Sequence, residues 1–372
     1  MSTSSARQPA SREIAGRATA QGTRRYAERY RAAFATDFYR PFGGDDLCVA
    51  SLGLGTYLGE PTAEDDARYG ATAKSALARG INVIDTAINY RCQRSERAIG
   101  KALSLAINRT ALRRDEIVVS SKGGYIPLDG APPESREDYA AYIRSEYIDA
   151  GLLSADDIVA GGHAIAPAYL ADQIARSRAN LGLRTIDLYY VHNPEQQLDA
   201  ISPELFRERL RAAFEMLEEK CAAGEIGRYG CATWNGLRTP PGERGHLGLA
   251  DLVAIATEVA GASHHFRAVQ LPINLAMNEA VRLPTQPLPS GAVVSLLQCA
   301  AELGVSVVAS ATLLQAKLAN GLPPQLGEAL PGLSTDAQRA IAFVRSLPVV
   351  STALVGMRSD AHLGENLEAG RA

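Results

Sequence analysis

The sequence predicts an α/β protein built as one (β/α)₈ TIM barrel, with an N-terminal extension and long loops after some strands. Three observations predict this fold. A short β-branched run followed by an amphipathic helix recurs along the 372 residues, the runs number eight, and no linker rich in Pro, Gly or Ser divides the chain. The near-continuous apolarity of the runs is typical of parallel strands buried on both faces. A doubly wound sheet is the alternative fold.

The candidate strands are residues 49–52, 81–84, 117–120, 186–191, 228–232, 268–271, 305–309 and 352–355. The clearest helices are predicted at residues 63–79, 96–106, 169–181 and 203–223. The last of these has defined ends, because Ser202 is a suitable N-cap, Pro203 fits the first turn and Gly224 follows the last turn.

The barrel is expected to occupy residues 46–372, preceded by an extension at 1–45 that contains a helix near 23–34. Residues 124–167 are far longer than an ordinary loop between a strand and its helix, and we interpret them as a lid at the barrel mouth. A second long segment, residues 313–333, follows the seventh strand.

The first 25 residues carry five arginines and one acid, a composition that faintly resembles an organellar transit peptide. We expect a flexible tail there instead.

Composition excludes several classes of protein. Apolar residues make up 46% and charged residues 21% of the chain, as in ordinary globular proteins. The net charge of −3 gives no reason to expect nucleic acid as a partner, and no apolar run is long enough to predict a membrane span or membrane partner. The five cysteines are scattered without a CxxC pair, which predicts neither a disulfide framework nor a metal site, and points to a reducing, cytoplasmic location.

Four residue types that complement one another follow three neighbouring predicted strands. Asp85 ends the second strand and Tyr90 follows it, Lys122 ends the third, and His192 ends the fourth. Catalytic groups of a barrel enzyme sit at these carboxyl ends of strands, so we expect the four side chains to meet.

Together these groups form an acid/base site. A phenol, with a pKa of about 10, is a poor acid or base at neutral pH. A nearby ammonium favours the phenolate and lowers this pKa, a carboxylate keeps the ammonium charged, and an imidazole orients a substrate oxygen. Taken singly, each residue is better explained as a cap, a solvated charge or a packing group; taken jointly, they predict catalysis.

The sequence resembles the aldo-keto reductase superfamily from about Arg40 to Asn366. The matching segments stand in family order: residues 51–56, 80–87 with Tyr90, 95–100, Ser121 with Lys122, 186–188 with His192 and Pro194, 224–228, Gln270 with Asn274, and Gly356 with Glu365 and Asn366. The resemblance implies Tyr90 as the acid/base, Lys122 and Asp85 as groups that tune it, and His192 as the group that orients a carbonyl. It also implies a small-molecule carbonyl or alcohol substrate, and NADP or NAD bound across the barrel mouth without a Rossmann domain.

The cofactor contacts implied by the resemblance, together with neighbouring candidates, are Gly55, Thr56, Asp85, Thr233, Gln270, Ser310, Gly356, Arg358, His362, Glu365 and Asn366. Arg358 favours NADP over NAD because a guanidinium can bind an adenosine 2′-phosphate, and a helix N-terminus beside it offers backbone N–H groups. An arginine on a solvated helix start is the alternative.

Two positions depart from the family pattern. The end of the fifth strand has Ala232 and Thr233 where relatives usually have Ser-Asn to hold the carboxamide, which Ala232 cannot do and Thr233 can do in part. Ser310 stands where relatives often have an aromatic ring that stacks on the nicotinamide. Trp234 either replaces that ring or belongs to the core or the pocket wall. Three functions therefore remain open: a carbonyl reductase, a sugar or alcohol dehydrogenase working in the oxidative direction, and a non-enzymatic NADPH-sensing subunit. The lid and the segment at 313–333 are expected to determine the substrate.

Overall fold

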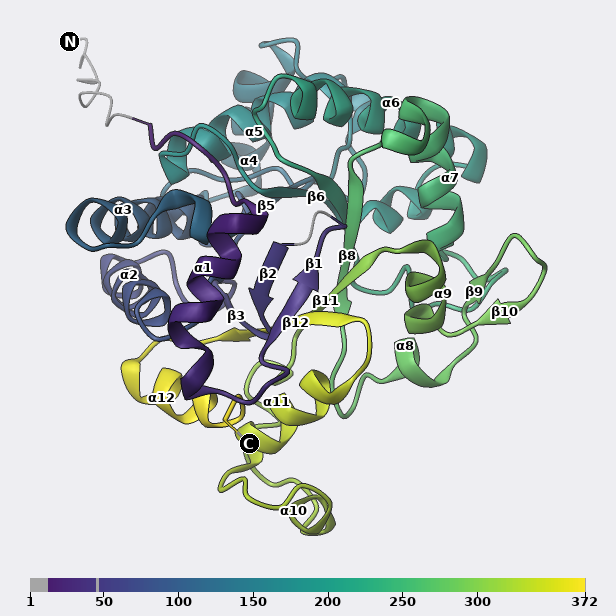
Figure 1. Cartoon of the computed structure of the whole chain (residues 1–372). Helices are drawn as coiled ribbons and strands as arrows, with labels where there is room; N and C mark the ends of the chain where they lie inside the picture. Colours follow the sequence, from purple (N-terminus) through teal and green to yellow (C-terminus); the bar gives the residue numbers. More distant parts are fainter. Residues whose placement is uncertain (1–12, 45–46, 372) are drawn as a thin grey trace, which may run out of the picture.

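Eight parallel strands form a closed barrel in a computed structural model that describes residues 13–44 and 47–371 (Figure 1). Around the barrel the strands follow the order β11-β12-β3-β4-β5-β6-β7-β8. Their bounds are β3 (Leu52–Gly55), β4 (Val83–Asp85), β5 (Val118–Gly123), β6 (Leu188–His192), β7 (Tyr229–Ala232), β8 (Phe266–Pro272), β11 (Ser306–Ser310) and β12 (Val350–Gly356). The predicted TIM barrel is confirmed, and seven of the eight predicted strands overlap an observed barrel strand by at least two residues.

A ring of helices surrounds the barrel, one after each strand (Figure 1). They are α2 (Ala63–Leu77), α3 (Arg94–Arg109), α5 (Pro167–Leu181), α6 (Pro203–Ala222), α7 (Leu249–Ala260), α9 (Leu296–Leu303), α11 (Asp336–Ser346) and α12 (Asp360–Glu368). Helix α6 has the predicted ends, because the Ser202 hydroxyl accepts a hydrogen bond from the Leu205 N–H and Gly224 follows with a positive φ of 73°. None of the helices in the described residues is both long and apolar enough to cross a membrane.

The loops after three strands carry additional elements. The loop after β8 contains α8 (Glu279–Arg282) and a small hairpin of β9 (Gln286–Pro287) and β10 (Val293–Val294). The loop after β11 contains α10 (Gln325–Ala329), which lies outside the helical ring in Figure 1. The loop after β5 is the predicted lid.

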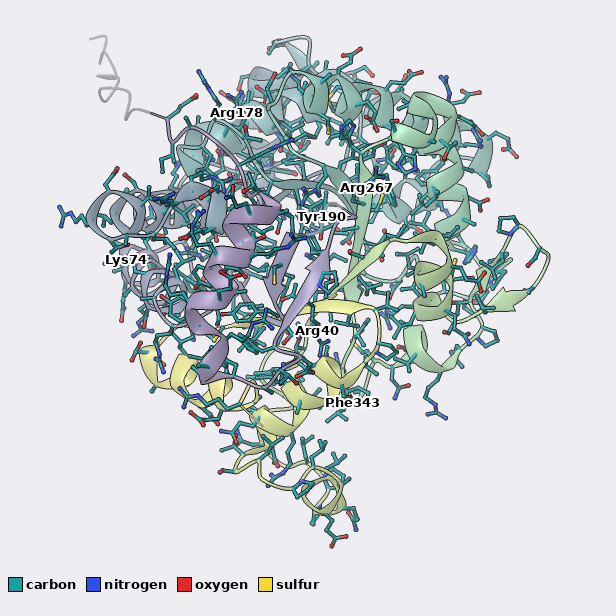
Figure 2. All side chains as sticks on the ribbon, viewed as in Figure 1. Arg40, Lys74, Arg178, Tyr190, Arg267 and Phe343 are labelled. Carbon is teal, nitrogen blue, oxygen red and sulfur yellow. The ribbon has the colours of Figure 1, made fainter. Side chains whose placement is uncertain are left out.

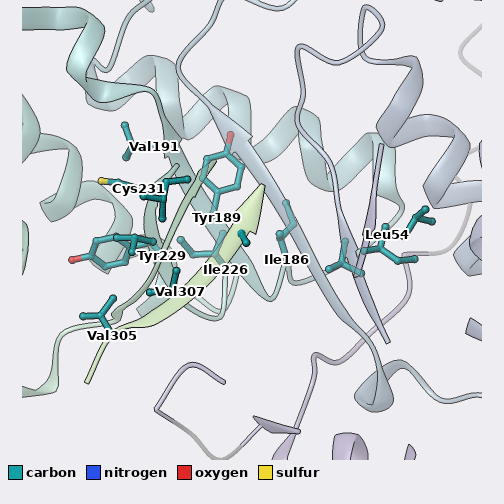
Figure 3. Close-up of a cluster of buried hydrophobic side chains, with 14 of the residues drawn as sticks. Leu54, Ile186, Tyr189, Val191, Ile226, Tyr229, Cys231, Val305 and Val307 are labelled. Atoms are coloured by element: carbon teal, nitrogen blue, oxygen red, sulfur yellow. The ribbon is translucent and has the colours of Figure 1, made fainter. Parts of the chain in front are cut away.

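Side chains of the barrel strands alternate between two apolar layers. Val119 and Tyr189 pack outward against the helices in the main core, part of which is shown in Figure 3. Val118, Leu188 and Tyr190 form a second cluster inside the barrel, and Figure 2 places Tyr190 near the centre of the ring of strands. Because successive side chains of a strand point to opposite faces, every second residue faces the barrel axis. This alternation directs the side chains at the carboxyl ends of the strands into the barrel mouth.

An antiparallel hairpin closes the opposite end of the barrel. Strands β1 (Tyr39–Phe42) and β2 (Leu47–Ala50) bury Phe42, Leu47 and Val49 against the interior cluster. The prediction of the first barrel strand at residues 49–52 is therefore wrong. Val49 and Ala50 belong to this hairpin, and the barrel uses Leu52–Gly55, whose glycines weaken the strand signal.

The N-terminal extension is bound to this closed end. The backbone N–H of Ala18 donates to Asp187 Oδ1 at 2.6 Å, and Arg25 and Arg29 of helix α1 (Ala20–Tyr30) pair with Glu116. Asp187 and Glu116 are buried, and Asp187 also pairs with Arg114 at 2.7 Å, so the docked segment supplies part of the hydrogen bonding that these buried charges need.

The transit-peptide or flexible-tail interpretation concerns residues 1–25. Residues 1–12 lie outside the described residues. From residue 13 onward the segment packs on the barrel, so a flexible tail is wrong for residues 13–25. The division of the chain at residue 46 stays a prediction.

The lid is a folded segment that contains α4 (Arg136–Ile143) and a turn of π-helix (Arg144–Ile148). The hydroxyls of Tyr142 and Tyr147 both donate to the backbone oxygen of Pro127, and that of Tyr139 donates to Gly161. Three of the four lid tyrosines therefore pack the lid. Tyr125 is the exception, because it lines the pocket described next.

Candidate active site

A cavity of about 440 Å³ opens at the carboxyl ends of the barrel strands. The last residue of most barrel strands lines it, including Gly55, Asp85, His192, Ala232, Ser310 and Gly356. Residues that were not predicted from sequence complete the wall, among them Tyr57, Asn89, Asn193 and Gln315. They come from loops, where no periodic pattern marks a position as facing the pocket.

The four predicted catalytic residues come together in this cavity. Lys122 Nζ donates to Asp85 Oδ2 at 2.5 Å and to the Tyr90 hydroxyl at 3.3 Å. Its third donor bond goes to the backbone oxygen of Thr86 at 2.9 Å. The ammonium is fully buried, and these three acceptors satisfy its three N–H groups. The ring of His192 faces Tyr90 edge-on, with 6.0 Å between ring centroids.

The other oxygen of Asp85 is also held. Ser120 donates to Asp85 Oδ1 at 2.7 Å and Gln270 donates to the same atom at 2.9 Å. Ser120 was not predicted, although it precedes Lys122 by two residues on one strand and so faces the same side. The carboxylate is thereby fixed beneath the ammonium that it neutralises.

Burial and charge act in opposite directions on the titrating groups. Burial raises the pKa of Tyr90, and the Lys122 ammonium opposes this without overcoming it. The expectation that Lys122 brings the phenol's pKa below its ordinary value is therefore wrong for the net shift, although right for the sign of the Lys122 effect. Burial alone would lower the pKa of Lys122, but Asp85 and Tyr90 raise it. Burial, with the Lys122 charge, lowers the pKa of His192 well below its ordinary value. At neutral pH the site thus holds a phenol, an ammonium and a neutral imidazole.

The predicted cofactor contacts divide into two groups. Seven of them line the cavity: Gly55, Thr56, Asp85, Thr233, Gln270, Ser310 and Gly356. Four lie outside its lining, on the segment after β12 and in α12: Arg358, His362, Glu365 and Asn366. Thr233 lines the cavity, and its hydroxyl is buried without a hydrogen-bond partner among the described residues.

Trp234 forms part of the pocket wall. The residue is 44% exposed, which excludes the alternative that it belongs to the core. The loop that carries it is held by Glu195, whose Oε1 accepts hydrogen bonds from the backbone N–H groups of Trp234, Asn235 and Gly236. Glu195 is buried, and sequence reasoning did not identify it.

The segment after β12 offers one basic side chain near the predicted phosphate position. Arg358 is about half exposed, and its Nη1 lies 3.4 Å from Asp65 Oδ1. Helix α12 begins beside it, but the Ser359 hydroxyl already accepts from the His362 N–H. Backbone donors at this helix start are therefore only partly free.

A family model and a curated protein each match about half of this sequence. A sequence model described as "Aldo/keto reductase family" matches residues 51–238, just over half of the chain. A curated Pseudomonas protein, D-threo-aldose 1-dehydrogenase, is 30% identical over 189 residues, and the chain spans about half the length of this relative.

Solved structures share the fold over most of their length. An aldo-keto reductase from Bacillus halodurans in its holo form has a TM-score of 0.59 at 21% identity, over 90% of this chain and 91% of that one. An aldo/keto reductase from Klebsiella pneumoniae in complex with NADP and acetate has a TM-score of 0.59 at 20% identity, over 90% of both chains.

Proposed function

The chain belongs to the aldo/keto reductase family, and we propose that it is an NAD(P)H-dependent oxidoreductase that interconverts a carbonyl and an alcohol with Tyr90 as general acid/base. The observation that carries this proposal is the contact chain from Asp85 through Lys122 to the Tyr90 hydroxyl, on the wall of a cavity. An ion pair with a purely structural role would not need a phenol between it and the cavity.

Each residue has a role in moving one proton. In reduction, the Tyr90 phenol gives its proton to the carbonyl oxygen, and the Lys122 ammonium stabilises the phenolate that remains. Asp85 keeps Lys122 charged in a fully buried position. His192 is neutral, so it can donate one ring N–H to the same oxygen without adding a charge. In oxidation the same groups act in reverse.

Features of the cavity and of the segment after β12 support a bound nicotinamide dinucleotide. The unpartnered Thr233 hydroxyl suits an amide, Gly55 and Gly356 leave room for close approach at adjacent strand ends, and Arg358 suits a phosphate. When bound, the cofactor supplies or takes up the hydride. We propose NADP as the preferred form; the NADP-bound Klebsiella relative and the charge of Arg358 support this choice.

A second function has one specific observation in its favour. The curated relative is an aldose 1-dehydrogenase, which acts in the oxidative direction according to its name. We therefore propose an aldose as the alternative substrate, oxidised at its anomeric carbon. The lid at residues 124–167 is proposed as a substrate wall in both cases.

The test is Tyr90→Phe. Cofactor binding is first measured by calorimetry with NADPH and NADH, and turnover is then measured on a panel of aldehydes, ketones and aldoses in both directions. We expect the variant to bind cofactor normally and to lose turnover by roughly 10²–10⁴-fold. Near wild-type turnover by the variant would remove Tyr90 from this role. Tight NADPH binding by the wild type without turnover on any substrate would favour a sensor over an enzyme.

A further inference from the structure

A second histidine, contributed by the lid, contacts the backbone of His192. His163 Nε2 lies 2.7 Å from the backbone oxygen of His192, and the side chain of His163 is fully buried. No role in the proposed reaction has been assigned to this residue. The two histidines are 29 residues apart, and His163 belongs to the segment that we interpret as a lid.

The hydrogen bonds around His163 determine which ring nitrogen carries its proton. Arg209 Nη1 donates to Gln197 Oε1 at 2.9 Å. Because an arginine side chain can donate hydrogen bonds but cannot accept them, the Gln197 amide is oriented with its oxygen toward Arg209. The Gln197 nitrogen then donates to His163 Nδ1 at 2.9 Å. Nδ1 is therefore an acceptor, and the proton lies on Nε2, which donates to the His192 oxygen.

Burial keeps His163 in this neutral form by lowering its pKa to about 4. A charged imidazole would place a proton on Nδ1 and lose the bond from Gln197. At neutral pH the hydrogen bonds from Arg209 to Gln197, from Gln197 to His163 and from His163 to His192 are therefore all donated in the same direction.

Close packing leaves little freedom at the contact. A Cβ on Gly124 would lie 2.7 Å from the His192 oxygen and 3.1 Å from His163 Nε2. The Tyr125 ring meets both imidazoles edge-on, with centroids 5.1 Å from His163 and 5.0 Å from His192. The lid therefore packs tightly against the end of β6.

His192 needs an external anchor for its orientation. Its Nδ1 is buried and has no hydrogen-bond partner among the described residues. The next residue, Asn193, has a positive φ of 47°, and its side chain donates to the Tyr125 hydroxyl at 2.7 Å. The direction of the His192 ring is thus set by its backbone and by the lid, because no ring hydrogen bond sets it.

We propose that His163 is a positioning residue for the carbonyl chemistry: its hydrogen bond to the His192 backbone fixes where the His192 ring meets the substrate oxygen. This rests on the proposed function of Tyr90 and His192. It makes the lid part of the catalytic apparatus as well as a wall, since a displacement of about 1 Å in a reacting group can lower a rate by about 100-fold.

The test compares three variants. His163→Phe keeps a ring and removes the donor, and His163→Gln restores an N–H near the position of Nε2. Tyr142→Phe is the matched control, because it removes another hydrogen bond from a lid side chain to a backbone oxygen, away from the cavity. We expect His163→Phe to lower kcat at least tenfold with an NADPH Kd within twofold of wild type, His163→Gln to recover most of the loss, and Tyr142→Phe to match wild type.

Nuclear magnetic resonance of ¹⁵N-histidine gives a readout that does not depend on turnover. The chain has six histidines. In the wild type we expect a protonated Nε2 and an unprotonated Nδ1 for His163, and in His163→Phe a shifted His192 signal. The proposal is overturned by wild-type kcat in His163→Phe, by equal losses in Tyr142→Phe, or by an Nδ1-protonated His163 in the wild type. A wild type that turns over no substrate contradicts the proposed function instead, and the nuclear magnetic resonance result then still decides whether His163 orients His192.

Discussion

The Arg358 guanidinium lies 3.4 Å from the Asp65 carboxylate, which is itself nearly buried. The other oxygen of Asp65 accepts from the backbone N–H of Glu60 at 2.7 Å, so the carboxylate is held in place. A phosphate that binds Arg358 must share it with this carboxylate. Because Arg358 is about half exposed, solvent screens the pair, and the competition is modest.

Asp65→Asn and Arg358→Ala should change the preference for NADPH over NADH in opposite directions. Asparagine retains an oxygen for the Glu60 N–H and removes the competing charge, so we expect NADPH to bind about two- to fivefold more tightly and NADH to be unaffected. Arg358→Ala should weaken NADPH binding about tenfold, since it removes charge-assisted hydrogen bonds. Isothermal titration calorimetry measures both constants. An equal change in the affinities for the two cofactors in Asp65→Asn would mean that Asp65 affects binding through the local structure and not by competing with the phosphate for Arg358.

Breaking the Lys122–Asp85 pair should cost stability as well as activity. Lys122→Met leaves a buried carboxylate without its counter-charge, so we expect a loss of about 3–5 kcal/mol in the free energy of unfolding. The double variant Asp85→Asn/Lys122→Met removes both charges and should regain much of that stability while remaining inactive. Urea unfolding with parallel assays separates the two effects. If the double variant were as unstable as Lys122→Met, charge would not be the cause.

Gly22 should be intolerant of a single added methyl group. It lies in α1, and a Cβ there would lie 2.1 Å from the backbone oxygen of Asp115. We expect Gly22→Ala to lower the free energy of unfolding by about 1–3 kcal/mol, because the helix must move away from the barrel. Gly70→Ala in α2 is the matched control: its Cβ would meet only the Ala98 oxygen at 3.8 Å. That variant should gain up to about 1 kcal/mol from helix propensity. Urea unfolding of the two variants is the measurement, and similar effects in both would contradict this account.

Acid should destabilise the protein partly through His163. Its folded pKa of about 4 lies below its ordinary value of 6.5, so the unfolded chain binds a proton first as the pH falls. The resulting loss of stability begins near pH 6.5 and is complete below about pH 4. Between pH 7 and pH 4.5 the wild type should therefore lose about 2–3 kcal/mol more than His163→Gln. Urea unfolding at the two pH values measures the difference, and parallel losses in both proteins would exclude His163 as the source.

The meeting of the four proposed catalytic residues, Asp85, Tyr90, Lys122 and His192, was predictable because they stand at strand ends or just after them. Strand ends are visible as the last residues of β-branched runs. Asp85, Lys122 and His192 face inward because each strand alternates, and Tyr90 follows within one short loop. By the same alternation Ser120 was within reach of prediction, although it was not predicted.

Other parts depend on contacts that no local pattern encodes. His163 lies in a long insertion, and only the folded chain brings it to His192. The arginines of α1 look like those of a tail until their partners Asp115 and Glu116, some 90 residues away, are placed beside them. The hairpin residue Val49 was assigned to the barrel because a buried hairpin that closes a barrel is as apolar as a barrel strand.

Trp234 is the single tryptophan of the chain, and it forms part of the cavity wall beside a loop held by Glu195. The protein therefore carries a single indole fluorophore, and it stands on the wall of the cavity. Its emission has no background from other indoles, so a spectral shift or quenching reports occupancy of the cavity directly. Energy transfer to a reduced nicotinamide would distinguish NADPH from NADP⁺ in the same cuvette, without a label.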